Sequence, residues 1–277
     1  MFSLLVLVCI ICILPAIWVL LTGFKDSQEI YSSMSFFPQD LTLGLAKERF
    51  LEAFSAMDFW RTSLNTLIQS VGDVLFSLIT CGLGGYVLSR LKPSGTKLVF
   101  MLIAWTMMMP SQIRTVPLFI SWLDFPFVAE LPGEVSLMNT YWPMWLTAAA
   151  NSFNVMLFKS HFDSISLSYI EAAKLDGCGN TRIFFNIMLP MSTPILIYVT
   201  IMTIKGSWSN FFTGYLVLTE VSKQTLPVRI FMLSTDRSVK MNTYMLCLIL
   251  SSLPTLLLYM LFQKYITGGV NVGGIKG

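Results

Sequence analysis

Six long apolar stretches alternate with shorter polar segments, and this pattern predicts an all-α polytopic membrane protein with about six transmembrane helices. With a rise of about 1.5 Å per residue, each stretch can cross a hydrocarbon layer about 30 Å thick. An even number of spans places both termini on one side, and we expect a single membrane domain over residues 1–277. The stretches run from Phe2 to Phe24, Leu64 to Ser89, Leu98 to Ile120, Thr140 to Phe158, Ile195 to Leu218 and Tyr244 to Ile266.

Two apolar stretches carry features of their own. The first begins at Phe2 with no basic residue ahead of it, so we expect that a short amino-terminal segment is missing or that later spans set the orientation. The third is interrupted by Pro110 and Pro117, and a broken helix at membrane depth is tolerated where it faces protein or water. We therefore expect this region to face a pathway or an outer vestibule.

A polar segment from Ser168 to Pro190 separates the fourth and fifth apolar stretches. Ser168 and Glu171 form an S-x-x-E capping box, which predicts a short helix that begins at Tyr169. Gly177 stands where a residue in the left-handed conformation would end that helix. We expect the segment to lie outside the bilayer.

The same segment predicts a second short helix. Thr181 can cap its amino terminus, and Pro190 predicts a boundary after Leu189 because the residue before proline is disfavoured in helical backbone. The expected local structure is therefore helix, turn, helix.

Composition supports the membrane assignment and excludes several classes of protein. With 55% hydrophobic residues, 12% charged residues and a mean hydropathy of +0.69, the chain is too apolar for a soluble domain, so membrane lipid is an expected partner. The net charge of +3 is not gathered in a basic run, and no nucleic-acid partner is expected. A single His argues against a zinc or copper site, so no metal site is predicted.

Enzyme motifs are missing from the sequence. It contains no H-E-x-x-H, which disfavours an intramembrane metalloenzyme, and no G-x-x-x-x-G-K-[ST] loop for nucleotide phosphates. We expect no enzyme activity and no cofactor on this chain. Any ATP and magnesium site must belong to a partner.

Ionisable and polar residues within the apolar stretches are candidates for a solute pathway, because such groups are costly in a bilayer. Asp73 and Lys205 could pair, could line an aqueous cavity, or Lys205 could extend toward an interface. Asn151 and Asn154 are three residues apart and are expected to share one face of a helix, where they suit either an interhelical contact or a sugar hydroxyl.

Trp208 and Asn210 complete the candidate pathway residues. An indole ring can stack on a sugar ring while an amide bonds its hydroxyls. Trp is also a common residue of the membrane interface. Both uses remain open for Trp208.

The polar segment also carries a specific spacing: Glu171-Ala172-Ala173, three residues, Gly177, nine residues, Ile187, one residue, Leu189-Pro190. This resembles the EAA loop of permease subunits in binding-protein-dependent ABC importers, and residues 168–190 are called the coupling loop below. Other segments resemble the carbohydrate-uptake branch, on the side of the second permease of maltose-type systems. They are Gly85-Tyr86-Val87-Leu88-Ser89-Arg90, Met109-Pro110 with Val116-Pro117-Leu118, Trp208-Ser209-Asn210-Phe211, Thr225-Leu226-Pro227 and Gly273-Gly274-Ile275-Lys276-Gly277.

The resemblance implies a function and a set of partners. Such a chain is one permease of a heterodimer that moves a sugar, expected to be an oligosaccharide, across the bacterial cytoplasmic membrane by alternating access. Two ATPase subunits and an extracytoplasmic solute-binding protein complete the importer, and both termini are cytoplasmic. The residues implied in contact with the ATPase are Glu171, Ala172, Ala173, Asp176, Gly177, Leu189, Pro190 and, in the Gly-rich tail over residues 268–277, Lys276.

An ion-coupled secondary transporter that uses Asp73 and Lys205 is the alternative function. It would have no need of a coupling loop, and its uptake would survive ATP depletion. No internal repeat is evident in the sequence, which disfavours an inverted-repeat transporter.

Overall fold

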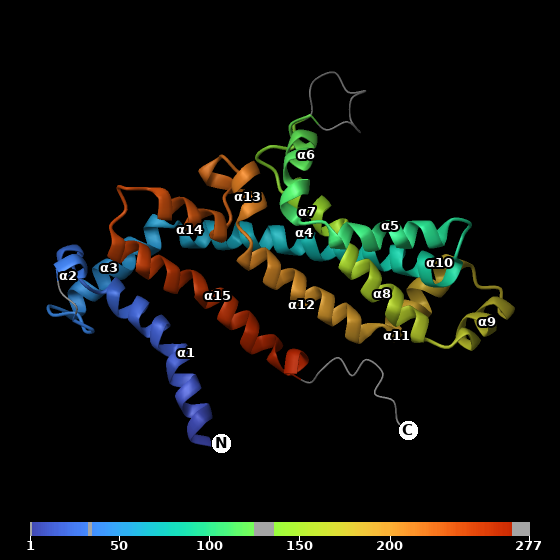
Figure 1. Cartoon of the computed structure of the whole chain (residues 1–277), viewed down its shortest axis with the longest axis horizontal. Coiled ribbons are helices and arrows are strands. Elements are labelled where there is room, and N and C mark those ends of the chain that lie inside the picture. The colour runs from blue at the N-terminus through green and yellow to red at the C-terminus, as the bar shows by residue number, and fades with distance from the viewer. Residues whose placement is uncertain (1, 33–34, 125–135, 268–277) are drawn as a thin grey trace. The chain divides into compact units, whose positions relative to one another are not determined.

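The computed structural model describes residues 2–32, 35–124 and 136–267, and every element of secondary structure within them is helical (Figure 1). The chain divides into two compact units, Met1–Thr66 with Glu220–Met260 and Leu67–Thr219 with Leu261–Gly277. The two long helices α4 (Phe59–Tyr86) and α15 (Met241–Thr267) each begin in the first unit and end in the second.

The first unit is held together by polar side chains that reach backbone groups. Thr66 Oγ1 accepts a hydrogen bond of 2.9 Å from the backbone N–H of Leu226, and Arg229 Nη2 donates to the carbonyl oxygen of Ala56 over 2.8 Å. These bonds satisfy backbone groups at the ends of helices. The unit contains α1 (Phe2–Gly23), α2 (Ser27–Ser32), α3 (Leu43–Ala56), the start of α4, the short 3₁₀ helix η4 (Val221–Lys223), α14 (Leu226–Thr235) and most of α15.

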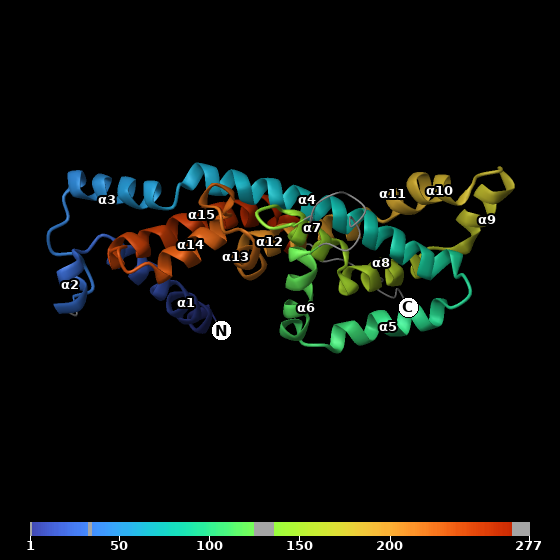
Figure 2. The ribbon, with the colours of Figure 1, turned by 90° about the horizontal axis from the view of Figure 1, so that it is seen from above.

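The second unit contains the continuation of α4 and the segments between it and α13. Helix α8 packs against η1, α5 and α12, and α7 packs against α13. The coupling-loop helices α9, α10 and α11 lie together at one end of this unit in both views (Figures 1 and 2). The elements are η1 (Val87–Leu91), α5 (Thr96–Met108), α6 (Ser111–Leu123), α7 (Trp142–Ala149), α8 (Ser152–Ser164), α9 (Leu167–Leu175), α10 (Asn180–Ile183), η3 (Phe184–Met188), α11 (Leu189–Met191), α12 (Thr193–Ser209) and α13 (Phe212–Val217).

The all-α membrane architecture is confirmed, with three long apolar helices among the described residues. These candidate spans are Ser3–Gly23, Phe59–Leu91 and Met241–Lys264. A fourth candidate is a bent pair, Asn180–Met191 with Thr193–Ser209, whose two helices differ in direction by 78°. The remaining apolar segments form shorter helices.

The third predicted span is divided into α5 and α6, as its prolines led us to expect. Met109 has an extended backbone with φ −78° and ψ 128°, because the following Pro110 disfavours the helical conformation at that position. Pro117 does not interrupt the chain a second time, since it lies inside α6.

Two other predicted spans are wrong as single helices. The stretch from Thr140 to Phe158 is α7 followed by α8, and the stretch from Ile195 to Leu218 is α12 followed by α13. Asn residues lie at both breaks. Asn151 Oδ1 accepts the backbone N–H of Asn154 over 3.0 Å, and Asn210 Oδ1 accepts that of Phe212 over 3.0 Å. Short amide side chains compete in this way for backbone groups that would otherwise continue a helix.

Candidate functional site

The first helix of the coupling loop, α9, begins two residues earlier than predicted. Its N-cap is Ser166, whose Oγ accepts the backbone N–H of Ser168 over 3.3 Å, so the capping box predicted at Ser168 is wrong. Ile165 has an extended backbone and is buried in the core, which ends α8 there. The chain is therefore already positioned at Ser166 to begin the next helix.

The end of α9 is confirmed at Gly177. This residue has φ +75°, a left-handed conformation that glycine adopts without the steric cost of a Cβ. The N–H of Gly177 donates to Lys174 O over 3.0 Å, and that of Cys178 donates to Ala173 O over 2.9 Å. Together these two backbone hydrogen bonds form a Schellman motif, which provides donors for carbonyl groups in the last turn of α9.

The second helix of the coupling loop differs from the prediction at both ends. Gly179, not Thr181, precedes the first helical residue, and the helical backbone continues through Pro190 to Met191. The π-helix η3 explains why Pro190 is tolerated. Leu189 N–H bonds Phe184 O across five residues, and Pro190 then falls in the first turn of α11, where a missing N–H costs little.

The coupling-loop residues divide into a buried set and an exposed set. Ala173 is buried, and Leu189 packs against the same hydrophobic cluster, which is built around Phe158, Phe162 and Phe184. The exposed set carries a mixture of apolar and charged side chains, with Leu175 90% exposed. It includes Tyr169, Glu171, Ala172, Lys174, Leu175, Asp176, Gly177 and Pro190. Lys276 and the Gly-rich tail lie outside the described residues.

A charged anchor holds the end of α8, directly before α9. The guanidinium of Arg90 donates to the carbonyl oxygens of Phe162 and Ile165. Beside it, Asp163 accepts hydrogen bonds of 2.6 Å from Ser89 Oγ and from Lys159 Nζ. Burial opposes ionisation of the Asp163 carboxyl, but these hydrogen bonds outweigh it and hold its pKa below its usual value.

Sequence reasoning had assigned no role to Arg90 beyond its place in a matched segment. Its partners are backbone carbonyls more than seventy residues away, at the carboxyl end of α8. A hydrogen bond to a backbone carbonyl can be accepted by any residue type, so it produces no recognisable pattern of side chains along the sequence. Only the structure could identify the anchor.

Replacing Arg90 with glutamine is expected to loosen the start of α9. The change removes charge-assisted hydrogen bonds to Phe162 O and Ile165 O, a loss of about 1.5–3 kcal/mol in the free energy of unfolding. Limited chymotrypsin digestion in detergent should then cut faster after the exposed Tyr169. Arg61→Gln is the control, since Arg61 is exposed and makes a single 3.6 Å ion pair with Asp58. Equal cleavage rates in the two variants would contradict the anchoring role.

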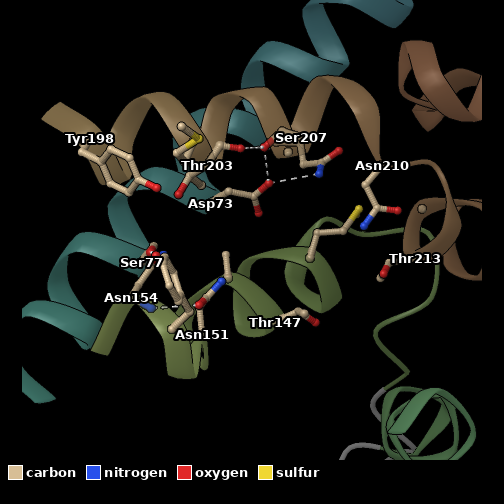
Figure 3. Close-up of a pocket in the computed structure, with 17 residues that line it drawn as sticks. Asp73, Ser77, Thr147, Asn151, Asn154, Tyr198, Thr203, Ser207, Asn210 and Thr213 are labelled. Carbon is tan, nitrogen blue, oxygen red and sulfur yellow. Dashed lines mark hydrogen bonds between the residues drawn. The ribbon is translucent and has the colours of Figure 1, made fainter. Parts of the chain in front are cut away.

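A polar cavity of about 380 Å³ lies between α4, α7, α8, α12 and α13 (Figure 3). All of its lining residues belong to the second unit. It is called the Asp73 cavity below. Hydroxyl and amide groups predominate among its polar lining residues, and Asp73 is the single carboxylate among those that the structure describes. The polar lining residues are Gln69, Asp73, Ser77, Thr147, Asn151, Asn154, Tyr198, Thr203, Ser207, Asn210 and Thr213.

Helix α4 contributes one polar face to the Asp73 cavity. Gln69, Asp73 and Ser77 are four residues apart, so they lie one above another on the helix. Gln69 Nε2 and Ser207 Oγ both donate to Asp73 Oδ2, over 3.1 Å and 2.7 Å. Asp73 Oδ1 is buried and has no hydrogen-bond partner in the part of the chain that the structure describes. The carboxyl group is thus held firmly through one oxygen only.

The structure brings together four of the six predicted pathway residues. Asp73, Asn151, Asn154 and Asn210 line the Asp73 cavity, whereas Lys205 and Trp208 do not. Asn151 and Asn154 do not share a helix face as predicted, because Asn151 precedes α8 and caps it. Asn154 Nδ2 donates to Ser77 Oγ over 3.0 Å, which joins α8 to α4.

Of the alternatives left open for Asp73 and Lys205, the structure does not show the pairing. Among the described residues no ion pair joins them, and Lys205 is exposed on α12. Ser207 is the residue of α12 that reaches Asp73. Two residues along a helix correspond to a rotation of roughly 200°, so Lys205 and Ser207 point in nearly opposite directions.

Several lining residues were missed from the sequence, and one pattern could have found some of them. Gln69 and Ser77 lie four residues on either side of Asp73, which makes a polar stripe on an otherwise apolar helix. Thr203 and Ser207 are likewise four residues apart on α12, whereas Tyr198 carries no such signal. Serine and threonine side chains are common in membrane helices as helix-to-helix contacts.

Two further cavities adjoin this region. One of about 420 Å³ is lined by Arg114, Trp122 and others, and it shares Thr147, Asn210 and Thr213 with the Asp73 cavity. The other, of about 630 Å³, is largely apolar and is lined in part by residues of α6, Pro117 among them. The proline-rich region therefore borders a cavity. No group of three or more potential metal ligands occurs among the residues that the structure describes.

Comparisons with known proteins place the chain among membrane components of importers. The family described as "Binding-protein-dependent transport system inner membrane component" matches residues 79–272. The chain is 28% identical to the arabinooligosaccharides transport system permease protein AraQ of Halalkalibacterium halodurans, over 96% of this chain and 92% of that protein. It is 29% identical to the diacetylchitobiose uptake system permease protein NgcG of Streptomyces coelicolor, over 99% of this chain and 87% of that protein.

A solved structure shares the fold. A chain from the crystal structure of a bacterial ABC transporter involved in the import of the acidic polysaccharide alginate superposes with a TM-score of 0.77 at 23% identity. The superposition covers 95% of this chain and 94% of that chain. At this identity the likeness establishes the architecture alone.

Proposed function

The chain belongs to the family of binding-protein-dependent transport system inner membrane components, and on that premise we propose that it carries an oligosaccharide through the Asp73 cavity. As a member of that family it is a multi-pass permease of the inner membrane that works with a binding protein, and it is not itself an enzyme. The single observation that carries the proposal is a cavity lined by hydroxyl and amide groups within an apolar protein. Such groups match the hydroxyls of a sugar.

The names of the relatives support a sugar as the solute. Two of them are a permease for arabinooligosaccharides and a permease for diacetylchitobiose, each similar to this chain along nearly its whole length. The volume of about 380 Å³ falls within the range of small-molecule sites. We infer that the residues in contact with the solute are Asp73, Asn151, Asn154 and Asn210.

We propose that α9 receives the motion that drives transport. Its exposed face presents Glu171, Ala172 and Leu175, which nothing in the chain covers among the described residues. An apolar and charged face of this kind suits a cleft on an ATPase subunit, and Ala173 and Leu189 would support it from within. A nucleotide can move the equilibrium only if the ATPase holds α9 differently in its two states.

The proposed assembly contains a second permease in a heterodimer, two ATPase subunits that hold ATP and magnesium, and an extracytoplasmic binding protein. In this arrangement residues 1–277 form one membrane domain, both termini are cytoplasmic, and Lys276 reaches toward the ATPase. Solute moves by alternating access. The alternative of ion coupling through Asp73 and Lys205 loses support, because the salt bridges of the described residues include none between these two and Asp73 is instead held by Ser207.

The proposal predicts that Glu171→Lys lowers ATP-driven uptake by about tenfold or more, since reversing a charge at a docking face replaces attraction with repulsion. The measurement is uptake of labelled arabinotriose and diacetylchitobiose by the complete complex in proteoliposomes that contain ATP. Glu48→Lys on α3 is the matched control, because Glu48 is also an exposed helical glutamate and lies outside the coupling loop. Uptake that survives ATP depletion and follows a proton gradient would contradict the proposed function.

A further inference from the structure

We propose that Oδ1 of Asp73 binds a hydroxyl group of the transported solute, which makes Asp73 the residue that selects hydroxyl-rich oligosaccharides without acidic groups. This inference rests on the proposed function and names the substrate class for the same cavity. It concerns one atom that has no hydrogen-bond partner among the described residues.

The carboxyl group of Asp73 is held in place through one oxygen, and its other oxygen accepts no hydrogen bond from the described residues. The side chain belongs to a residue that is only 5% exposed, and both protein donors, Gln69 Nε2 and Ser207 Oγ, bond the same oxygen, Oδ2 (Figure 3). A carboxylate oxygen left without a hydrogen bond in a buried position is costly. Because Asp73 also lines the cavity, a ligand there can supply the missing partner.

A hydroxyl group fits Oδ1 better than other ligand groups. It can donate a hydrogen bond to an ionised carboxylate and accept one from a protonated carboxyl, so it satisfies Asp73 in either state. A ligand carboxylate only accepts, and beside an ionised Asp73 it would be repelled. A metal cation would need further carboxylates, and Asp73 is the single one among the described lining residues.

The surrounding side chains suit the rest of a sugar. Thr203, Asn151 and Thr147 offer hydroxyl and amide groups around the cavity, and Figure 3 shows them on several sides of it. Tyr198 and Phe153 add aromatic rings to the lining, which can cover the apolar face of a sugar ring. The combination of a few polar groups with apolar walls is typical of sites for small polar molecules.

Among the described residues that line the three cavities, the basic side chain is that of Arg114. Arg114 lines the two neighbouring cavities and is not among the residues that line the Asp73 cavity. A solute at Asp73 would therefore meet one acidic group and no basic side chain from the described lining. This balance disfavours an acidic sugar at that position.

The test uses the complete complex in proteoliposomes and a pair of sugars that differ mainly in charge, galactobiose and digalacturonate. The affinity of the binding protein for each sugar is measured separately, and uptake is compared with the binding protein saturated. Asp58→Asn is the matched control, since Asp58 is a partly exposed residue of the first unit with φ +47°, a conformation that Asn tolerates.

The expected result has two parts. The unchanged complex imports galactobiose about tenfold faster, or more, than digalacturonate. Asp73→Asn lowers uptake of the neutral sugar about tenfold, while ATP hydrolysis stimulated by the loaded binding protein stays within about twofold. A purely structural role would lower uptake and hydrolysis together. The control variant should transport like the unchanged complex.

Other outcomes separate the two proposals. ATP-driven import that prefers digalacturonate would overturn the selectivity and leave the importer function intact, as would unchanged galactobiose uptake by Asp73→Asn. If no probe is imported with ATP, both proposals fail. Should Asp73→Asn not assemble, Asp73→Glu keeps the carboxylate and displaces it by one methylene. Uptake by that variant at the unchanged rate would also overturn the inference.

Discussion

Replacing Gly177 with valine is expected to remove most ATP-driven uptake, whereas Gly179→Val should leave it near the unchanged level. Both glycines have open space around the position of a Cβ, so neither change creates a clash. They differ in backbone: Gly177 has φ +75°, and Gly179 has φ −71° with ψ 161°, an extended conformation that valine adopts readily. The pair therefore isolates backbone strain at one position of the coupling loop.

The effect on transport should be large because the strain falls at the end of α9. A left-handed conformation costs an L-residue about 1–2 kcal/mol, and a β-branched one more. Relief of that strain would break the bonds from Gly177 N–H to Lys174 O and from Cys178 N–H to Ala173 O. The exposed face of α9 would then no longer be presented in one orientation.

The measurement is sugar uptake per ATP hydrolysed by the complete complex in proteoliposomes, together with co-purification of the ATPase. Gly177→Val should lower the uptake ratio by about tenfold, from strain of about 1.4 kcal/mol or more. Equal ratios in the Gly177 and Gly179 variants would contradict a coupling role for the shape of this turn.

The second large effect is expected at Gly85, where α4 meets α8. A Cβ added there would lie 2.6 Å from Phe158 Cβ and 2.8 Å from the backbone nitrogen of Lys159. Backbone atoms cannot move aside as a flexible side chain can, so the two helices must separate. Gly85→Ala is therefore expected to destabilise the second unit by about 1–3 kcal/mol.

Gly84→Ala is the matched control for this prediction. At Gly84 an added Cβ would meet Val155 at 3.5 Å, which is ordinary van der Waals contact. Thermal unfolding of the purified complex in detergent is the measurement, with the yield of assembled complex as a second readout. A midpoint for Gly85→Ala that equals that of Gly84→Ala would show that α4 and α8 do not pack closely in the folded protein.

Sequence patterns predicted the helical class and the turn at Gly177, because both depend on local properties. A run of apolar residues must form helices in a bilayer, where backbone groups have no water to bond. The turn after α9 needs a residue that accepts φ +75°, and glycine alone does so without strain. Neither conclusion required knowledge of distant contacts.

Helix boundaries were predicted less well because several signals compete within one segment. Ser166 and Ser168 are both capable caps, and the burial of Ile165 decided between them. Asn151 begins a helix and Asn210 ends one inside apolar stretches, a use of the amide that competes with pointing it at a neighbouring helix. Hydropathy averaged over a window cannot register a single hydrogen bond of this kind.

The sequence by itself determined that this chain is a helical membrane protein, that residues 168–190 form a turn-containing element with a specific spacing, and that Asp73 requires an explanation. Only the tertiary structure decided that Ser207, and not Lys205, meets Asp73, and that Arg90 holds the end of α8. The physical reason is that such partners are chosen by the rotation and approach of helices. Those depend on close contacts between residues far apart in the chain, which no local pattern contains.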